Sequence, residues 1–320
     1  MIRKDVASVS VNLTPSFVNV STVSLLTAGV LEFLRRATVR AKDRFPRLRG
    51  PIQRFENSYD RWKFFLIGSR NARRQDERLA PVKPFGIYWI DASAVSFYGG
   101  ADFILDAGWI LPGDWDLEPV RFDDLPLYRA FVDRYVKGQP WKETYLYRSG
   151  RTALEGGSHT HCASVEGLER WLERFDDLQE TMTEDGYRTQ QELLSEGADP
   201  TGTTALRGLF PAPARSVAVH EIAVSIGRDG HFHLDDGRHR LSIAKILDIE
   251  IAVRIVRRHA KWQAFRERIA TRLDQASDNE LDPDEARRLI REEYGDELEG
   301  VFLGLKHPDL DVLFEDRFDQ

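Results

Sequence analysis

The sequence is poor in cysteine and contains no long apolar run. Its one cysteine, Cys162, excludes an internal disulfide framework and favours a reducing compartment. The most apolar stretch, residues 23–34, is much shorter than the ~20 residues that a membrane-spanning helix needs, and it contains Glu32. Residues 1–21 lack the basic, apolar and small-residue order of a secretory signal. We therefore expect a cytoplasmic protein without a transmembrane span.

Common cofactor-binding motifs are missing as well. The sequence contains neither a P-loop motif nor a GxGxxG motif of the Rossmann type. Two histidine pairs, His159 with His161 and His231 with His233, have the alternation that places both rings on one strand face. Zn²⁺ needs further ligands, and the sequence does not place them beside either pair. We find no indication of zinc, haem or flavin binding.

The composition is that of a folded protein with unevenly distributed charge. Hydrophobic residues make up 42% of the 320 residues, including 7 Trp and 18 Phe, so the chain can bury a substantial core. Residues 1–83 contain 17 Lys and Arg against 7 Asp and Glu, whereas the remainder contains 28 against 45. This asymmetry indicates either an anionic partner for the N-terminal part or docking of one half of the chain on the other.

Residues 22–45 follow a helical pattern in which one arc is apolar. The basic residues Arg44, Arg47 and Arg49 follow it closely. Such an amphipathic helix can make peripheral contact with an anionic membrane surface or nucleic acid through residues 22–49. It can equally pack on its own protein. The apolar arc consists of Leu26, Val30, Phe33, Leu34, Ala37 and Ala41.

The chain divides into four regions by composition, and the predicted fold class is α+β. Residues 1–50 form a basic N-terminal arm, and residues 51–200 form an α+β region of no assigned family. Residues 201–262 form a compact module, and residues 263–320 form an acidic helical extension. Gly197–Pro213 is the most linker-like stretch, because Pro and Gly interrupt it repeatedly, and it predicts a boundary near residue 200.

Several elements outside the module are well marked. Residues 87–90 predict a strand that ends at Asp91, and residues 125–135 predict a helix. Residues 164–182 predict a long amphipathic helix with Ser164 as its N-cap, and Asp282-Pro283 predicts another helix start. Residues 113–116 predict an aromatic-anchored turn; the alternative is that Trp115 stacks on a sugar or a base.

The module has the most defined order of elements. Residues 217–226 predict a strand, residues 228–230 a turn, and residues 231–234 a return strand. Residues 236–240 then form a charged loop that opens a helix, and residues 251–256 have the pattern of a buried strand.

The loop has the chemistry of an anion-binding site. Gly237 lets a ligand approach the backbone, and the first turn of the helix offers free N–H groups at its positive dipole end. Arg238, His239 and Arg240 add donors, and Asp236 is placed as N-cap, metal-side ligand or base. In the alternative interpretation, Asp236 or its neighbour Asp235 merely caps a surface helix and the arginines are solvated.

Residues 211–262 resemble the ParB/sulfiredoxin-like superfamily in this order of elements and in the loop. The sequence Gly237-Arg238-His239-Arg240 stands where sulfiredoxins have Gly-Cys-His-Arg and ParB proteins have Gly-Glu-Arg-Arg. With Asp236 included, the loop is similar to the Asp-Gly-His-His-Arg loop of free-serine kinases. The resemblance implies that these residues bind the phosphates of a nucleotide, with ATP, ADP or CTP and Mg²⁺ as expected ligands. Arg238 replaces the sulfiredoxin cysteine, which argues against sulfinic-acid reduction.

Two classes of function stay open on these grounds. One is a Mg²⁺-dependent phosphotransferase or hydrolase in which Asp236 or Glu221 is metal ligand or base and His239 is electrophile or proton carrier. The other is a non-catalytic protein that binds a nucleotide or an anionic polymer. The enzyme requires Asp236, Glu221 and the loop cations to converge on one open cleft. For Glu221 the alternative is a surface carboxylate beside an edge strand.

Overall fold

The computed structural model describes residues 49–71, 85–99, 108–156, 164–197, 213–279, 281–298 and 307–318, together with residues 45, 47, 73 and 162. By its contacts the chain divides into two compact units, Met1–Phe55 and Glu56–Gln320. Apart from Phe45, the helix expected over residues 22–45 lies outside the described residues, as does the pair His159 and His161.

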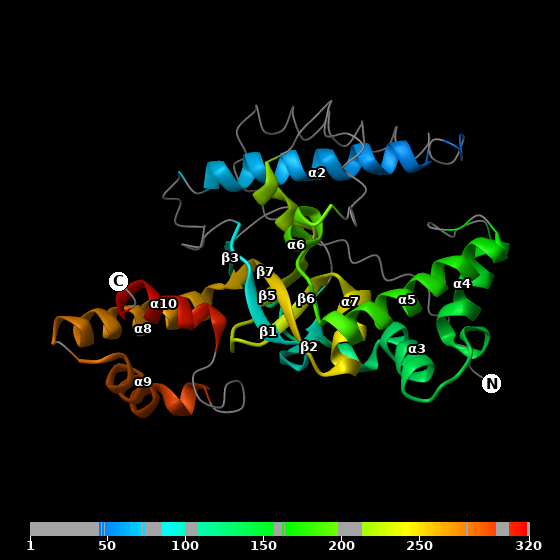
Figure 1. Ribbon diagram of the computed structural model, residues 1–320. Helices are drawn as coiled ribbons and strands as arrows, with labels where there is room; N and C mark the ends of the chain where they lie inside the picture. The colour runs from blue at the N-terminus through cyan, green and yellow to red at the C-terminus, as the bar shows by residue number, and fades with distance from the viewer. Residues whose placement is uncertain are drawn as a thin grey trace. The chain divides into compact units, whose positions relative to one another are not determined.

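One mixed sheet of seven strands forms the centre of the second unit (Figure 1). Its order is β1-β7-β5-β6-β2-β4, and β3 also pairs with β7. β5 runs parallel to β7 and antiparallel to β6, and β3 runs parallel to β7. The strands are β1 (Tyr88–Asp91), β2 (Val95–Tyr98), β3 (Trp109–Leu111), β4 (Val120–Arg121), β5 (Ile222–Ile226), β6 (Phe232–Asp236) and β7 (Glu250–His259).

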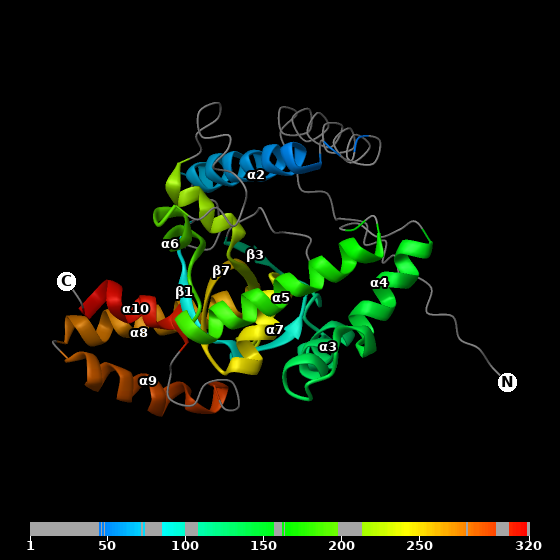
Figure 2. The same cartoon turned by 45° about the vertical axis from the view of Figure 1, so that its right-hand side comes forward.

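Helices surround this sheet, and together with it they make the protein α+β. The helices α3, α5 and α7 contact one another, and α8 contacts both α9 and α10 (Figure 2). No helix in the described ranges is long and apolar enough to cross a membrane. The helices are α2 (Arg49–Asn71), α3 (Pro126–Tyr135), α4 (Tyr145–Glu155), α5 (Val165–Asp185), α6 (Gln190–Ser195), α7 (Arg238–Leu247), α8 (Ala260–Asp278), α9 (Pro283–Leu298) and α10 (Pro308–Phe318).

The strand β7 is the centre of the core. All its residues after Glu250 are buried. β5 pairs along one of its edges, and β1 and β3 pair with the two halves of the other edge. Its first half is rich in Ile and Val, as expected for a strand covered on both faces. The strand predicted over residues 251–256 is therefore confirmed, and it continues through Arg257 and Arg258 to His259.

The predicted helix starts are confirmed. The Oγ of Ser164 accepts a hydrogen bond from the Gly167 N–H at 3.1 Å and so caps α5. A carboxylate oxygen of Asp282 accepts from the Glu285 N–H at 2.8 Å at the start of α9, whose first residue is Pro283. The strand predicted over residues 87–90 is β1, and the helix predicted over residues 125–135 is α3.

The strand predicted to begin at Val217 is wrong in its first half. Residues 214–220 form a 3₁₀ helix, η6 (Ala214–His220), and only residues 222–226 belong to β5. The apolar side chains of Ala218 and Val219 pack with Phe64 of α2 instead of lying in the sheet. The guanidinium of Arg61 donates to the Ser216 Oγ and to the Pro213 carbonyl, both at 3.1 Å, which fixes this helix against α2.

The boundary expected near residue 200 does not separate two compact units. β1 and β2 come from the region before it, and they pair with β7 and β6 from the region after it. Both regions belong to the unit Glu56–Gln320. Residues 198–212 of the linker-like stretch lie outside the described residues, and the strand pairing between the two regions was not visible in the sequence.

A buried ionic cluster joins the C-terminal helix to β7. The carboxylate of Asp309 accepts from both Nε (2.7 Å) and Nη2 of Arg258 and from the indole N–H of Trp262 at 2.9 Å. The neighbouring His307 is completely buried and stacks on Phe232 with 4.8 Å between ring centroids. Its Nδ1 accepts from the Asp309 N–H at 3.0 Å, which places the proton on Nε2. Burial lowers the pKa of His307 to about 4.

The first prediction concerns the pH dependence of stability. Because the pKa of His307 is below its ordinary value, the unfolded state takes up the proton first, and stability falls as the pH drops from about 6.5 toward about 4. This histidine should contribute about 2 kcal/mol to the loss between pH 7.5 and pH 5. Asn at this position retains a capping oxygen but does not titrate. Urea unfolding should therefore show that His307→Asn loses less unfolding free energy than wild type between pH 7.5 and pH 5. An equal loss would contradict the assignment of this pH dependence to His307.

Candidate functional site

The loop between β6 and α7 depends on glycine. Gly237 is the N-cap of α7 and has a left-handed backbone with φ of +94°. A Cβ built there would lie 2.8 Å from Cγ1 and 3.1 Å from Cα of Ile222, the first residue of β5. Both the backbone angle and the space exclude an ordinary side chain. Gly237 therefore has a backbone geometry that a side chain would strain.

Among the residues that the structure describes, none caps the start of α7 with its side chain. Gly237 has none to offer, and the Gly237 carbonyl accepts the first helical bond, from the Leu241 N–H at 3.0 Å. Asp236 is exposed at the end of β6 and makes no capping bond. Asp235 is buried and binds Ser225 and Arg257. The expected capping by either aspartate is therefore wrong, because both residues belong to the strand.

Glu221 and Arg240 lie beneath the loop in one hydrogen-bonded network. Arg240 donates to the Tyr187 hydroxyl at 3.0 Å and to the His220 carbonyl at 2.5 Å, and its Nη1 is 3.6 Å from Glu221 Oε2. Glu221 accepts from the Tyr187 hydroxyl at 2.9 Å and from the Gln190 N–H at 2.5 Å. The network thus joins the loop to the first residue of α6.

The burial of Glu221 excludes one of its two predicted interpretations. The residue is 1% exposed, so the surface-carboxylate alternative is wrong, and its Oε2 lies 3.6 Å from Nη1 of the loop residue Arg240. Burial raises the pKa of Glu221, although the charge of Arg240 and the hydrogen bonds from Gln190 and Tyr187 oppose this. Its carboxylate is engaged by groups of the protein itself, which suits an anchor more than a base.

The third predicted catalytic residue, His239, lies among aromatic rings. Its imidazole stacks on Phe175 of α5 at 4.7 Å and contacts Trp171 edge-on at 5.7 Å. Phe131 of α3 lies 6.1 Å away. Arg238, one residue earlier, is exposed. The structure therefore keeps Asp236, Gly237 and Arg238 together at the loop surface, while His239 packs against the α3–α5 pair.

Sequence reasoning missed Tyr187 and Gln190, which hold Glu221 in place. Both follow α5 in the chain and lie more than thirty residues before Glu221. A tyrosine after a helix-ending glycine and a glutamine at a helix start are common features, so no local pattern marks them. Only the fold brings them to the loop.

The turn at residues 113–116 is an aromatic-anchored turn, as predicted. The Trp115 indole N–H donates to the Leu111 carbonyl at 3.3 Å. The guanidinium of Arg257 lies over the Trp115 ring at 4.4 Å, so one face of the indole is already covered. The carboxylate of Asp116 is buried. It accepts hydrogen bonds from the guanidinium and from the backbone N–H of Arg228.

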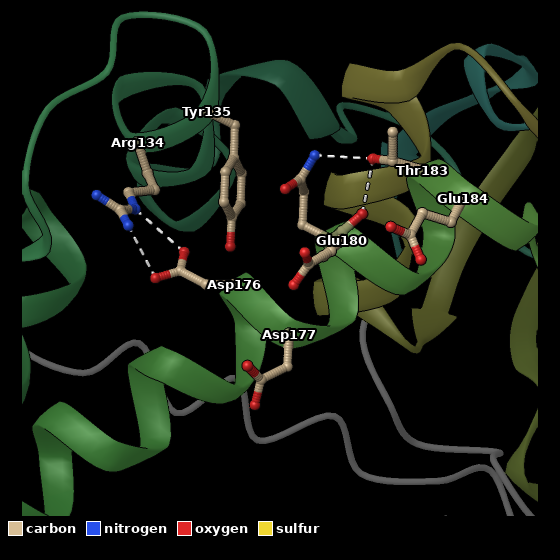
Figure 3. A pocket seen from close by; sticks show the side chains of 8 residues that line it. Arg134, Tyr135, Asp176, Asp177, Glu180, Thr183 and Glu184 are labelled. Carbon is tan, nitrogen blue, oxygen red and sulfur yellow. Dashed lines mark hydrogen bonds and ion pairs between the residues drawn. The ribbon is translucent and has the colours of Figure 1, made fainter.

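A hollow of the surface lies on α3 and α5, away from the loop. Figure 3 shows a hollow of about 500 Å³ lined by side chains of α3 and α5, where Asp176 binds Arg134. Residues 236–240 do not line it. Within the described ranges, no group of three or more His, Cys, Asp or Glu side chains is arranged to hold a metal ion.

The second prediction tests the loop backbone. Gly237→Ala should destabilise the protein by roughly 2–4 kcal/mol, because it adds a contact with Ile222 to the strain of a left-handed residue. Gly138→Ala is the matched control, since Gly138 also has positive φ but would meet nothing within 4 Å. Chemical denaturation measures both. Equal destabilisation would show that the contact with Ile222 does not constrain the loop.

Comparison with protein-family models, with curated proteins and with solved structures finds no match in any of the three. The resemblance of residues 211–262 to the ParB/sulfiredoxin-like superfamily therefore stays a prediction from the loop motif and the order of its elements.

Proposed function

We propose that residues 211–262 form a ParB/sulfiredoxin-like module whose loop, residues 236–240, binds the phosphates of a nucleotide or another phosphate-bearing ligand. The uncapped start of α7 carries this proposal. A glycine with a left-handed backbone precedes the first N–H groups of a ten-residue helix, and the exposed Arg238 stands beside them. The amides of the first helical turn, the helix dipole and a cation together favour an anion.

The two arginines of the loop have different roles in this proposal. Arg238 is exposed and supplies the charge-assisted hydrogen bonds to phosphate. Arg240 is held by Tyr187, the His220 carbonyl and Glu221, so it anchors the first turn of α7 to the protein beneath. Its positive charge still adds to the potential at the loop, partly offset by Glu221.

Binding is better supported than turnover. A phosphotransferase with Mg²⁺ would need an accessible carboxylate, and Asp236 is the exposed one at the loop. The carboxylate of Glu221 is occupied by Tyr187 and Gln190, so it does not serve as a second metal ligand without rearrangement. We therefore propose ligand binding as the function of the loop, with Asp236 as the metal ligand or base if the bound nucleotide reacts.

The third prediction tests this binding by thermal shift with ATP, ADP, CTP and GTP, each with and without Mg²⁺. A ligand at 100 times its Kd stabilises the folded protein by about 2.7 kcal/mol. Arg238→Ala should weaken the affinity for the nucleotide that binds about ten- to a hundredfold, because it removes a charge-assisted contact. Arg288→Ala, at an exposed position of α9, is the control and should leave the affinity unchanged.

Two outcomes would contradict the proposal. One is the absence of stabilisation by any of the four nucleotides. The other is a nucleotide affinity that Arg238→Ala and Arg288→Ala change equally. Stabilisation that requires Mg²⁺ would favour the phosphotransferase, whereas stabilisation without it would favour a binding protein.

A further inference from the structure

A second polar cluster lies at the opposite end of the sheet from the Gly237 loop. β3, β5 and β7 are parallel, so their carboxyl ends meet at one edge. Trp115 and Asp116 follow β3, and Gly227 and Asp229 follow β5. β6 runs antiparallel to β5, so its first residues reach the same edge while its last residues lead into the loop. Ligands of open α/β sheets commonly bind beyond the carboxyl ends of the strands.

His233 of β6 is the central residue of this cluster. It is 3% exposed, and within the part of the chain that the structure describes its side chain forms no hydrogen bond. Its ring lies 5.2 Å from Phe97 and 5.8 Å from Trp115 between centroids. Burial lowers the pKa of His233 to about 4, so at neutral pH the ring is uncharged and one nitrogen keeps its lone pair.

Three polar side-chain atoms converge over the α-carbon of Gly227. A Cβ built on this glycine would lie 2.8 Å from Nε2 of His233, 3.2 Å from Oδ1 of Asp229 and 3.3 Å from Oδ2 of Asp116. His233 Nε2 and Asp229 Oδ1 can accept a hydrogen bond from a ligand, whereas both oxygens of Asp116 already accept from Arg228. Any larger residue at position 227 would have to displace the imidazole. Glycine therefore lets these three side chains lie close to the backbone.

The cations of the cluster are already bound to carboxylates. Arg228 contacts Asp116 at 2.8 Å and Asp114 at 2.9 Å, and Arg257 contacts Asp235 at 3.2 Å. The side chains of Asp114 and Asp229 are nevertheless 76% and 55% exposed. Asp229 is not among the carboxylates that these two arginines bind, so its acceptor capacity is what the cluster can offer to a ligand.

The other buried histidine of this edge has its partners. His259 accepts from the Lys261 N–H at Nδ1, at 3.0 Å, which places its proton on Nε2. That nitrogen is 2.8 Å from the Gly113 carbonyl, to which it donates. His259 therefore has a structural role at the start of α8, and His233 is the imidazole left to bind a ligand.

We propose that His233 and Asp229, bordered by the ring of Phe97, bind a small organic cation that carries N–H donors, such as a primary ammonium group. An ammonium group offers three donors and no acceptor, which complements the acceptor atoms of His233 and Asp229. The exposed carboxylates attract it, and an aromatic ring favours a cation over its face. This site is independent of the phosphate site at the Gly237 loop.

The fourth prediction uses n-butylammonium as the probe on the full chain, with n-butanol as the neutral analogue and butyrate as the anionic one. Long-range ¹H–¹⁵N spectra record the ring signals of the histidines. The set of signals that disappears in His233→Gln belongs to His233, and we follow that set during the titration. We expect a saturable shift with butylammonium and none with the analogues. Asp229→Asn should weaken this binding about two- to fivefold, since the lost carboxylate is solvent-exposed. Asp284→Asn, at an exposed position of α9, should not change it.

Asp229 lies in an exposed turn, so we expect the circular dichroism spectrum of Asp229→Asn to match that of wild type. A difference in affinity then reports on binding and not on folding. An equal response to n-butanol would show an apolar contact rather than a cation site. The absence of a saturable shift, or equal affinities of the Asp229→Asn and Asp284→Asn variants, would also overturn the proposal. None of these results bears on nucleotide binding at the Gly237 loop.

Discussion

Three arginines on one buried strand constrain the second unit. Arg254, Arg257 and Arg258 of β7 are each at most 5% exposed, and an uncompensated buried charge costs several kcal/mol. The carboxylates that bind two of them come from distant segments, Asp235 from β6 and Asp309 from the start of α10. The hairpin and the C-terminal helix are therefore held to β7 by charge as well as by apolar packing. Removing one of these carboxylates would be far more damaging than removing an exposed one.

The same strand arrangement separates the two candidate sites. β5 pairs with β7 in parallel and with β6 in antiparallel fashion, so the turn after β5 and the loop after β6 lie at opposite ends of the sheet. A glycine is required at each end, for different reasons. Gly237 needs a left-handed backbone beside Ile222, whereas a side chain at Gly227 would meet His233. The cationic, uncapped loop suits phosphate, and the acceptor-rich turn suits a cation.

Local features of the fold were predictable from the sequence, and long-range partners were not. Helix starts at Ser164 and Pro283 follow from capping chemistry within one turn, and the conformation of Gly237 follows from its place between a strand and a helix. The pairs Arg258 with Asp309 and Tyr187 with Glu221 join residues 51 and 34 positions apart, without any periodicity to mark them. The strand prediction for the apolar run at residues 217–219 was wrong, because burial against α2 selects the same types of side chain as burial in a sheet.

The backbone amides at the start of α7 test the central claim most directly. In a ¹H–¹⁵N titration of the full chain with ATP and Mg²⁺, and with the other nucleotides in turn, we expect the amide signals of residues 238–240 to shift saturably with at least one of them. The signals of Gly227 and His233, at the other end of the sheet, should stay in place. This fifth prediction would be contradicted if the amides of residues 238–240 did not respond to any nucleotide, or if the shifts appeared at Gly227 and His233 instead.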